Sequence, residues 1–210
     1  MQLLGRLEIK SKERIIKFLN TQDTGRICSI DRDGFPQIIP MNFVYAGGAI
    51  YMHSHIKGEK LQNISRNPKV GFEVDKSLEF LPSYFGHPTD ASQADTLYIS
   101  VVIKGLGEII TDKVEKAFAL NSLMEKYQPE GRYEKIRDDM HVLDEVAIIK
   151  IIPESMRGKY KVGQHMDRST RLKIAKLITE RNSPSSKETL RFMGVGLKKG
   201  TLEIVEEPDW

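Results

Sequence analysis

The sequence contains one cysteine, few aromatic residues and no long apolar run. Because Cys28 has no partner in the chain, it forms no internal disulfide and offers no cysteine framework for zinc, which agrees with a reducing compartment. No segment approaches the roughly 18 apolar residues that a bilayer span requires, so we expect no membrane segment. The first residues lack the apolar core and small-residue cleavage site of a secretory signal. These absences predict a cytoplasmic protein. Because Cys28 lies in the apolar run Arg26-Ile27-Cys28-Ser29-Ile30, we expect it to be a small, buried side chain rather than a reactive thiol.

The chain has 210 residues, of which 40% are hydrophobic and 29% charged, enough for one compact globular domain with appendages. Its net charge of +3 is unevenly distributed. Residues 1–155 have a net charge of −2, residues 156–200 one of +9, and the last ten residues carry four acids and no base. We predict a first domain of residues 1–155 and a basic extension of residues 156–210. Three interpretations of the basic residues in 156–200 are open: they face water, they bind a phosphate-bearing ligand, or they contact nucleic acid.

The hydrophobic period changes from helical to strand-like near Gly25. Apolar residues behind Ser11 predict an amphipathic helix over residues 11–22. Alternating runs then predict strands over residues 26–31, 36–45 and 49–55. Asp33-Gly34 and Gly47-Gly48 supply the positive φ that tight turns between such strands need. This part of the chain is predicted to be an antiparallel meander.

The same reasoning extends to the rest of the chain. We expect helices over residues 57–67, 112–127 and 169–181, strands over 69–75, 97–110 and 145–152, a long loop over 76–95, and a strand-like segment over 201–205. Six strands with few helices predict a mainly β protein, a closed six-stranded antiparallel β-barrel with flanking helices and a helical, basic C-terminal extension.

His53-Ser54-His55 ends the third predicted strand and places two imidazoles on one face of it. A metal could be held by such a pair. However, His87, His141 and His165 are scattered and suggest no third ligand, so we predict no metal site. Nucleophilic catalysis by Ser54 is disfavoured too, because no glycine-framed elbow surrounds it.

The residues that follow favour a phosphate group. A hydroxyl and an imidazole at the strand end, from Ser54 and His55, are followed by Lys57 and Gly58 at the turn and by Lys60 in the first turn of the next helix. Free backbone N–H groups at a helix start, together with lysines, attract a dianion. A solvated, lysine-rich helix start is the alternative.

Five motifs in a fixed order carry a family resemblance. They are Gly34-Phe35-Pro36-Gln37-Ile38-Ile39-Pro40-Met41-Asn42-Phe43, Ile50-Tyr51-Met52-His53-Ser54, Lys57-Gly58-Glu59-Lys60-Leu61, Asn67-Pro68-Lys69-Val70 and Ser100-Val101-Val102-Ile103-Lys104-Gly105. Over residues 10–152 the chain resembles the FMN-binding split β-barrel superfamily. That superfamily includes pyridoxamine 5'-phosphate oxidase and, closer in pattern here, the nitroimidazole-resistance (Nim-type) flavoproteins.

The resemblance implies a homodimer that binds FMN at the subunit interface. The implied cofactor-binding residues are Pro40, Met41, Asn42, Phe43, His53, Ser54, His55, Lys57, Lys60, Leu61, Ser100, Val101, Lys159 and Gln164, the last two from a C-terminal loop that crosses to the partner. His53 and His55 are also the implied catalytic residues. The implied activity is that of a flavin-dependent oxidoreductase, in which NADH or NADPH reduces FMN and a small nitroaromatic or quinone-like molecule accepts the electrons.

Some motifs depart from the pattern of pyridoxamine-phosphate oxidases. Those enzymes carry an arginine-rich strand and an Arg-Lys pair for phosphate, where this chain has Pro40-Met41-Asn42-Phe43 and Lys57-Gly58-Glu59-Lys60. Val102 is neutral in the last motif. Oxidation of vitamin B6 compounds is therefore not expected.

Two other classes of function stay open at this point. One is a carrier or redox sensor that holds a flavin, a deazaflavin or haem without turnover, with a histidine as axial ligand to haem. The other is binding of nucleic acid through the basic extension, where Arg168, Arg171, Lys173 and Lys176 cluster near a predicted helix start. Few aromatic residues accompany these bases and no nucleic-acid motif is present, which disfavours that class.

Overall fold

The computed structural model describes residues 5–208, which form two compact units. The barrel unit comprises Lys12–Val74 and Val101–Arg157, and the extension unit comprises residues 5–11, 75–100 and 158–208. Three long strands run through both units: β6 (Lys69–Leu81), β7 (Asp95–Ile110) and β8 (Val146–Lys161). The domain boundary at residue 155 stays a prediction.

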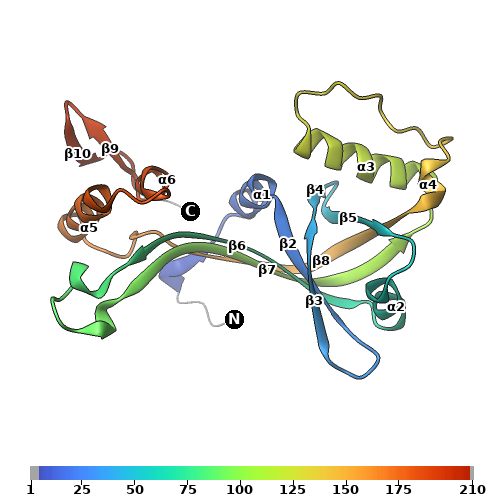
Figure 1. Ribbon diagram of the computed structural model, residues 1–210, viewed down its shortest axis with the longest axis horizontal. Coiled ribbons are helices and arrows are strands. Elements are labelled where there is room, and N and C mark those ends of the chain that lie inside the picture. Colours follow the sequence, from blue (N-terminus) through green and yellow to red (C-terminus); the bar gives the residue numbers. More distant parts are fainter. Residues whose placement is uncertain (1–4, 209–210) are drawn as a thin grey trace. The chain divides into compact units, whose positions relative to one another are not determined.

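The barrel unit contains four further strands and four helices among the described residues. The strands are β2 (Thr24–Ile30), β3 (Pro36–Asn42), β4 (Val44–Ala46) and β5 (Ala49–His55), and the helices are α1 (Lys12–Thr21), α2 (Glu59–Arg66), α3 (Lys113–Tyr127) and α4 (Val142–Glu145). Figure 1 shows α3 lying against β4 and β5. The predicted helices over residues 11–22, 57–67 and 112–127 are confirmed. The N-terminus of α3 is capped by Asp112, whose carboxylate accepts the Glu115 N–H.

The extension unit contains shorter elements. They are a 3-10 helix η1 (Gly5–Leu7), β1 (Glu8–Ile9), the 3-10 helices η2 (Ser83–Phe85) and η3 (Ala91–Gln93), α5 (Arg168–Arg181), α6 (Ser186–Phe192), β9 (Val195–Lys198) and β10 (Thr201–Ile204). The helix predicted over residues 169–181 is confirmed as α5, and the strand-like segment at 201–205 is β10, which pairs with β9. Helix α6 was not predicted.

The order of the strands requires the sheet of the barrel unit to curl. Of the ten strands in residues 5–208, eight form one antiparallel sheet in the order β3-β2-β6-β7-β8-β5-β4, with β1 paired to β8. β3 and β4 are the two ends of this order, yet only Phe43 separates them in the chain. One residue can bridge the two edges only if the sheet bends round until they meet. The predicted mainly β split barrel with flanking helices is confirmed, although with more than six strands.

Three details of the predicted strands are wrong. The run 36–45 is two strands, β3 and β4, on opposite edges, so the first strands do not form a simple meander. β6 continues to Leu81, so the loop that follows is shorter than predicted. β8 continues through Pro153 to Lys161, well beyond the predicted end at residue 152. Pro153 lies beyond Ile151, the last residue of β8 that pairs with β5, so the missing N–H breaks no bond to that strand.

Phe43 is held at the crossover by the end of α3. Its ring is fully buried and lies edge-on to Phe72, with centroids 5.1 Å apart. The Phe43 N–H donates to the Tyr127 hydroxyl at 2.9 Å, and the Lys126 ammonium donates to the Phe43 carbonyl at 2.8 Å. A residue between two strands leaves its backbone groups outside the ladders, so they need such partners when buried.

The core of the barrel unit includes a cluster between α3 and strands β4, β5 and β8. Its buried members are Val44, Ala49, Tyr51, Ile110, Ala119, Leu123 and Ile148. Strand residues alternate in burial, as on β7 and β2, because one face of each strand meets the core. Cys28 lies on the outward face of β2 and is only partly buried, so its predicted burial is wrong.

No helix within residues 5–208 is long and apolar enough to cross a membrane.

Candidate functional site

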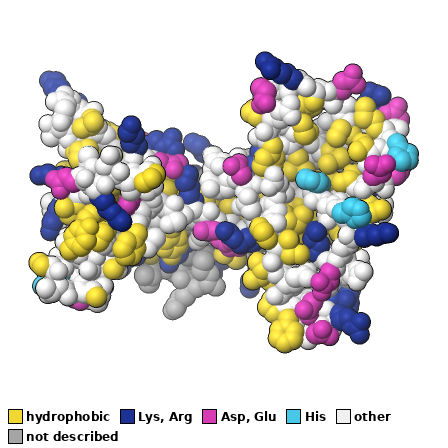
Figure 2. Space-filling model, in the orientation of Figure 1, with side chains coloured by type: hydrophobic (Ala, Val, Ile, Leu, Met, Phe, Trp, Pro, Cys, Tyr) yellow, Lys and Arg dark blue, Asp and Glu magenta, His cyan; other side chains and the backbone are white. Residues whose placement is uncertain are grey.

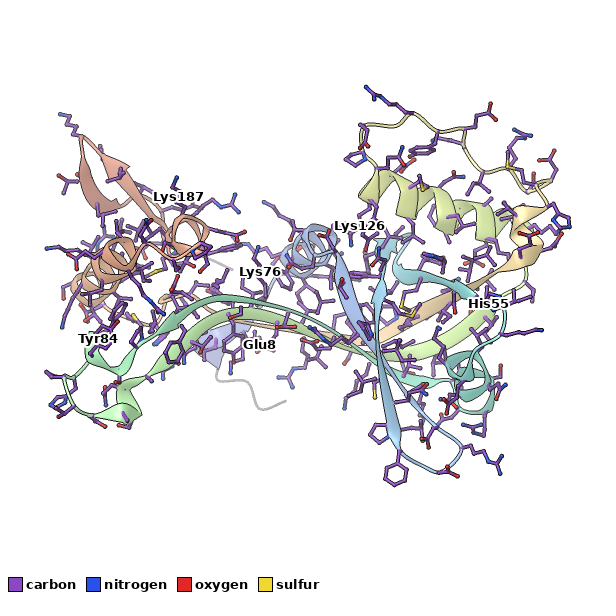
Figure 3. The ribbon with its side chains drawn as sticks, viewed as in Figure 1. Glu8, His55, Lys76, Tyr84, Lys126 and Lys187 are labelled. Atoms are coloured by element: carbon purple, nitrogen blue, oxygen red, sulfur yellow. The ribbon has the colours of Figure 1, made fainter. Side chains whose placement is uncertain are left out.

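The histidine pair lies on an exposed face at the end of β5. His53 and His55 are exposed, whereas Ser54 between them is buried, as the alternation of a strand requires. In the barrel unit, on the right of Figure 2, histidine side chains are exposed among hydrophobic ones. Figure 3 shows His55 where β5 leads toward α2. The two imidazoles are therefore available to a ligand on this face.

His55 also fixes the turn that follows it. Its Nδ1 accepts a 3.0 Å hydrogen bond from the backbone N–H of Lys57. In the tautomer that accepts this bond, Nδ1 carries no proton and Nε2–H is the ring donor that remains. The Ser54 hydroxyl donates to the His55 carbonyl at 3.2 Å. The strand end and the start of α2 are thus joined by short local bonds.

The N-terminus of α2 is open to an anion. Gly58 occupies the N-cap position, and no side chain caps the helix there. The Lys60 ammonium folds back over this end, because its Nζ lies 3.7 Å from the place that a Cβ on Gly58 would take. Lys57 is exposed beside it. Uncapped amides and two ammonium groups are the donors that a phosphate monoester dianion needs, so the residues fit such a group.

Polar bonds tie α2 to β3. The buried side chain of Asn63 donates to Gln37 of β3 at 3.2 Å, and Gln37 donates to Glu59 at 2.6 Å. These bonds bring the helix start next to β3 although Gln37 and Glu59 are 22 positions apart in the sequence. The start of α2 is therefore fastened to β3 at Gln37, three residues before Pro40.

The predicted residues of β3 and of the crossover that follows it differ in exposure. Pro40 and Asn42 are exposed and Met41 is partly buried, whereas the Phe43 side chain is fully buried. Val101 of β7 is fully buried too, and Leu61 of α2 is 8% exposed. Phe43 and Val101 therefore support the site from the core in the single chain, and their side chains are not presented to a ligand.

Three predicted residues lie in the extension unit. Ser100 is partly buried at its boundary on β7, and the Lys159 ammonium lies 5.2 Å from the centroid of the Tyr98 ring. Gln164 is engaged by its own neighbours: its amide donates to the Arg6 and Tyr160 carbonyls and accepts from the Val162 N–H. The assignment of these three residues to the pocket of the barrel unit stays a prediction.

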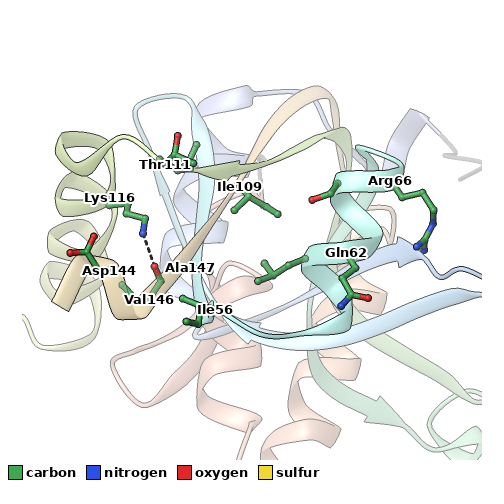
Figure 4. A pocket seen from close by; sticks show the side chains of 12 residues that line it. Ile56, Gln62, Arg66, Ile109, Thr111, Lys116, Asp144, Val146 and Ala147 are labelled. Carbon is green, nitrogen blue, oxygen red and sulfur yellow. Dashed lines mark hydrogen bonds between the residues drawn. The ribbon is translucent and has the colours of Figure 1, made fainter. Parts of the chain in front are cut away.

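A large open pocket that was not predicted from the sequence lies beside α2, where Leu61, Gln62, Ser65 and Arg66 line it. Its volume is about 790 Å³, and Figure 4 shows it between α2, the end of β7, and the residues where α4 leads into β8. Its lining combines apolar and polar residues: Ile56, Leu61, Gln62, Ser65, Arg66, Ile109, Ile110, Thr111, Lys116, Asp144, Val146 and Ala147. The Lys116 ammonium donates hydrogen bonds to the carbonyls of Leu143 at 2.5 Å and Val146 at 2.8 Å. Only Leu61 belongs to both this lining and the predicted residues.

Within residues 5–208, no three histidine, cysteine or acidic side chains gather in a way that could hold a metal ion. His165 of the extension unit is partly buried, and its Nδ1 has no hydrogen-bond partner. Burial lowers the pKa of His165, and the nearby charges of Arg6 and Lys161 lower it further. His165 is therefore a neutral imidazole at neutral pH.

The comparisons with known proteins agree with this fold. The sequence matches the family described as pyridoxamine 5'-phosphate oxidase over residues 11–160. The chain is a member of that family. No curated protein was found to match the sequence.

Solved structures with the same fold are diverse. A candidate 5-nitroimidazole antibiotic resistance protein from Bacteroides thetaiotaomicron is 25% identical, with a TM-score of 0.62 over 73% of this chain and 86% of that one. A flavocytochrome from Azotobacter vinelandii is 17% identical, with a TM-score of 0.66 over 77% and 72% of the two chains. A FAD- and heme-binding protein from Mycobacterium smegmatis is 19% identical, with a TM-score of 0.63 over 73% of each. The last two establish similarity of fold alone.

Proposed function

We propose that this protein binds FMN and acts as a flavin-dependent oxidoreductase, passing electrons from a reduced nicotinamide to a small nitroaromatic or quinone-like acceptor. One observation carries the proposal: the uncapped start of α2, with Lys60 folded over Gly58, adjoins the exposed His53 and His55. The family match and the 25% identity to a candidate nitroimidazole resistance protein support it. FMN itself rather than another flavin is part of the proposal.

The residues of the barrel unit divide the binding between two parts of the cofactor. Lys57, Lys60 and the first amides of α2 would hold the phosphate of FMN, and Pro40, Met41 and Asn42 of β3 would lie along its ring. When bound, FMN supplies the acceptance and donation of one or two electrons. The protein supplies position, hydrogen bonds and exclusion of water.

His53 and His55 would serve proton transfer and substrate contact. Because His55 Nδ1 accepts from the Lys57 N–H, its Nε2–H is the donor that remains for a ligand. His53 is two residues away on the same exposed face and makes that face imidazole-rich. Imidazole can give and take protons near neutral pH, which reduction of a quinone or a nitro group requires.

We propose a homodimer with FMN at the interface. The barrel unit exposes large apolar side chains on its β2–β3 hairpin, with Phe35 68% and Ile38 63% exposed. Ile38 also lines a shallow pocket of about 290 Å³ on the outer face of the sheet, together with Arg26, Cys28, Gly71, Phe72, Glu73 and Val102. Apolar surface of this kind supports a subunit contact.

Oxidation of pyridoxamine 5'-phosphate is not part of the proposal. Pro40 and Asn42 are neutral on the exposed face of β3, and Val102 is neutral on β7. A second candidate is a flavin or haem carrier without turnover. It is favoured by the exposure of His53 and His55, because an exposed imidazole can be an axial ligand to haem.

Steady-state kinetics separates these functions. The full-length protein would be loaded with FMN and mixed with NADH or NADPH, then with a nitroaromatic or a quinone. We expect oxidation of the nicotinamide that depends on both FMN and acceptor. If FMN stays bound and no nicotinamide is consumed, the protein is a carrier and not an oxidoreductase.

A further inference from the structure

Arg171 occupies a position where the fold calls for an apolar side chain. In α5 it shares the inward face with Ile174, Ala175 and Ile178, and its own side chain is 2% exposed. Arginine is rarely buried so completely unless its charge is paired. A leucine or a methionine at this position would fill the same space in the packing of α5. The guanidinium therefore indicates a role other than packing.

The guanidinium of Arg171 is only partly satisfied. Its Nη2 donates to Glu207 Oε2 at 2.6 Å, whereas Nε and Nη1 are buried and have no hydrogen-bond partner. A buried donor without an acceptor is costly, because it has given up water and gained nothing. The arginine therefore has more donors than the two oxygens of one carboxylate can use.

Glu207 bridges two arginines. Its Oε1 accepts from Arg168 Nη1 at 2.6 Å, so each oxygen of the carboxylate takes one guanidinium. Both arginines lie in the first turns of α5. The neighbouring acid, Asp167, accepts hydrogen bonds from the Ser169 hydroxyl and from the N–H and hydroxyl of Thr170 instead. The site is thus a pair of guanidinium groups with one carboxylate between them.

Few bonds hold the segment that carries Glu207. The N–H groups of Val205 and Glu206 donate to the Gly194 carbonyl, and the Tyr160 hydroxyl donates to the Pro208 carbonyl at 3.0 Å. The Glu207 side chain is 59% exposed, in contrast to Arg171 beneath it. An external anion can therefore reach the carboxylate and replace it without unfolding α5.

We propose that Arg168 and Arg171 form a phosphate-binding site that Glu207 of the chain's own C-terminal segment occupies and that a phosphate group takes by displacing it. A phosphate has more acceptor oxygens than a carboxylate and carries up to twice the charge, so it can engage donors of Arg171 that Glu207 leaves unpaired. The site gives part of the basic surplus of residues 156–200 a specific role. The argument for this site does not rest on the flavin binding proposed for the barrel unit.

The test uses the full-length chain and calorimetric titration with inorganic phosphate at constant ionic strength. Glu207→Gln removes the competing charge, so we expect it to bind phosphate at least ten times more tightly than the wild type. Glu206→Gln makes the same change of charge one residue away and is expected to match the wild type. Arg168→Met in the Glu207→Gln background is expected to return the affinity to the wild-type level or below.

Arg171→Met in the Glu207→Gln background is likewise expected to weaken phosphate binding, and its folding is checked separately because Arg171 is buried. Arg168 is 67% exposed, so its variant keeps the fold and carries the test if Arg171→Met fails to fold. A parallel titration with adenosine 5'-monophosphate identifies the source of the phosphate: tighter binding than inorganic phosphate indicates a nucleotide, and equal binding indicates the free ion. The inference is overturned if Glu207→Gln and Glu206→Gln bind phosphate equally, or if Arg168→Met leaves the affinity of Glu207→Gln unchanged.

Discussion

The hydroxyl of Tyr127 accepts the N–H of Phe43, the single residue between β3 and β4, at 2.9 Å. The same hydroxyl donates toward the Asp23 carbonyl at 2.5 Å and lies 3.1 Å from the Phe43 carbonyl oxygen. One side chain at the end of α3 thus fastens the point where the sheet closes. Figure 3 shows its neighbour Lys126 at the same place.

Removing that hydroxyl should weaken the whole barrel unit. In Tyr127→Phe the Phe43 N–H stays buried without its partner, which costs about 1 to 3 kcal/mol of unfolding free energy. Urea denaturation measures this loss. Tyr84→Phe, at a side chain that is 63% exposed, is the matched control and should change the stability by less than about 0.5 kcal/mol. Equal stability of the two variants would refute the role of Tyr127.

Lys126 makes stability depend on pH in a defined direction. Burial lowers its pKa to about 8, against the opposing charge of Asp23, while the unfolded chain keeps the ordinary value of 10.5. Between these two values the unfolded chain binds a proton that the folded chain has lost, so raising the pH favours the folded state. Below pH 7 both states hold the proton, so Lys126 no longer makes the unfolding free energy depend on pH.

The measurement is a comparison with Lys126→Met, which cannot titrate. From pH 7.5 to pH 10, the unfolding free energy of the wild type should rise relative to the variant by about 1 kcal/mol, a value reduced for the solvent access of this side chain. Using the difference cancels the other groups that titrate in this range. A difference that is flat or falls with pH would show that Lys126 keeps its proton throughout.

Lys60 should matter for the affinity of FMN. In Lys60→Ala the loss of a charge-assisted bond to the phosphate is expected to weaken FMN binding by about 1.5 to 3 kcal/mol. Fluorescence titration of FMN gives the dissociation constant. Lys17→Ala removes the same charge from the exposed side of α1 and should leave the constant unchanged. Unchanged affinity in Lys60→Ala would remove this lysine from the site.

His53 should affect turnover more than binding. His53→Asn keeps a polar side chain on the exposed face but removes a group that can deliver a proton near neutral pH. We expect the turnover with a quinone acceptor to fall by a factor of about 10² or more, the usual contribution of general acid catalysis. The FMN affinity should change less than twofold. Loss of FMN instead of loss of turnover would make His53 a binding residue only.

The sequence predicted the local elements of the barrel well because their signals are local. Asp112 and the apolar spacing behind it predict α3, and the two glycines at positions 47 and 48 predict the turn between β4 and β5, where both have positive φ. The division at Phe43 leaves no such signal. It arises from pairing with strands far along the chain, and the residues on both sides of it look like one β-rich run.

The site was predictable in the same uneven way. The exposure of His53 and His55 and the burial of Ser54 follow from the period of a strand, and Lys60 follows from the start of a helix. The burial of Phe43 and Val101 does not, since apolar residues on a strand can face a core or a ligand. Arg171 was noticeable only as part of a basic segment, and its partner Glu207 comes from a tail whose course the sequence does not reveal.

The measurement that tests the account most directly is the absorbance spectrum of the purified full-length protein, with the pigment released by heat and identified by mass. We predict the paired bands of an oxidised flavin, near 375 and 450 nm, and the mass of FMN. A single strong band near 400 nm would show that the bound pigment is haem and not a flavin. A colourless protein that also fails to take up added FMN would contradict the proposed function.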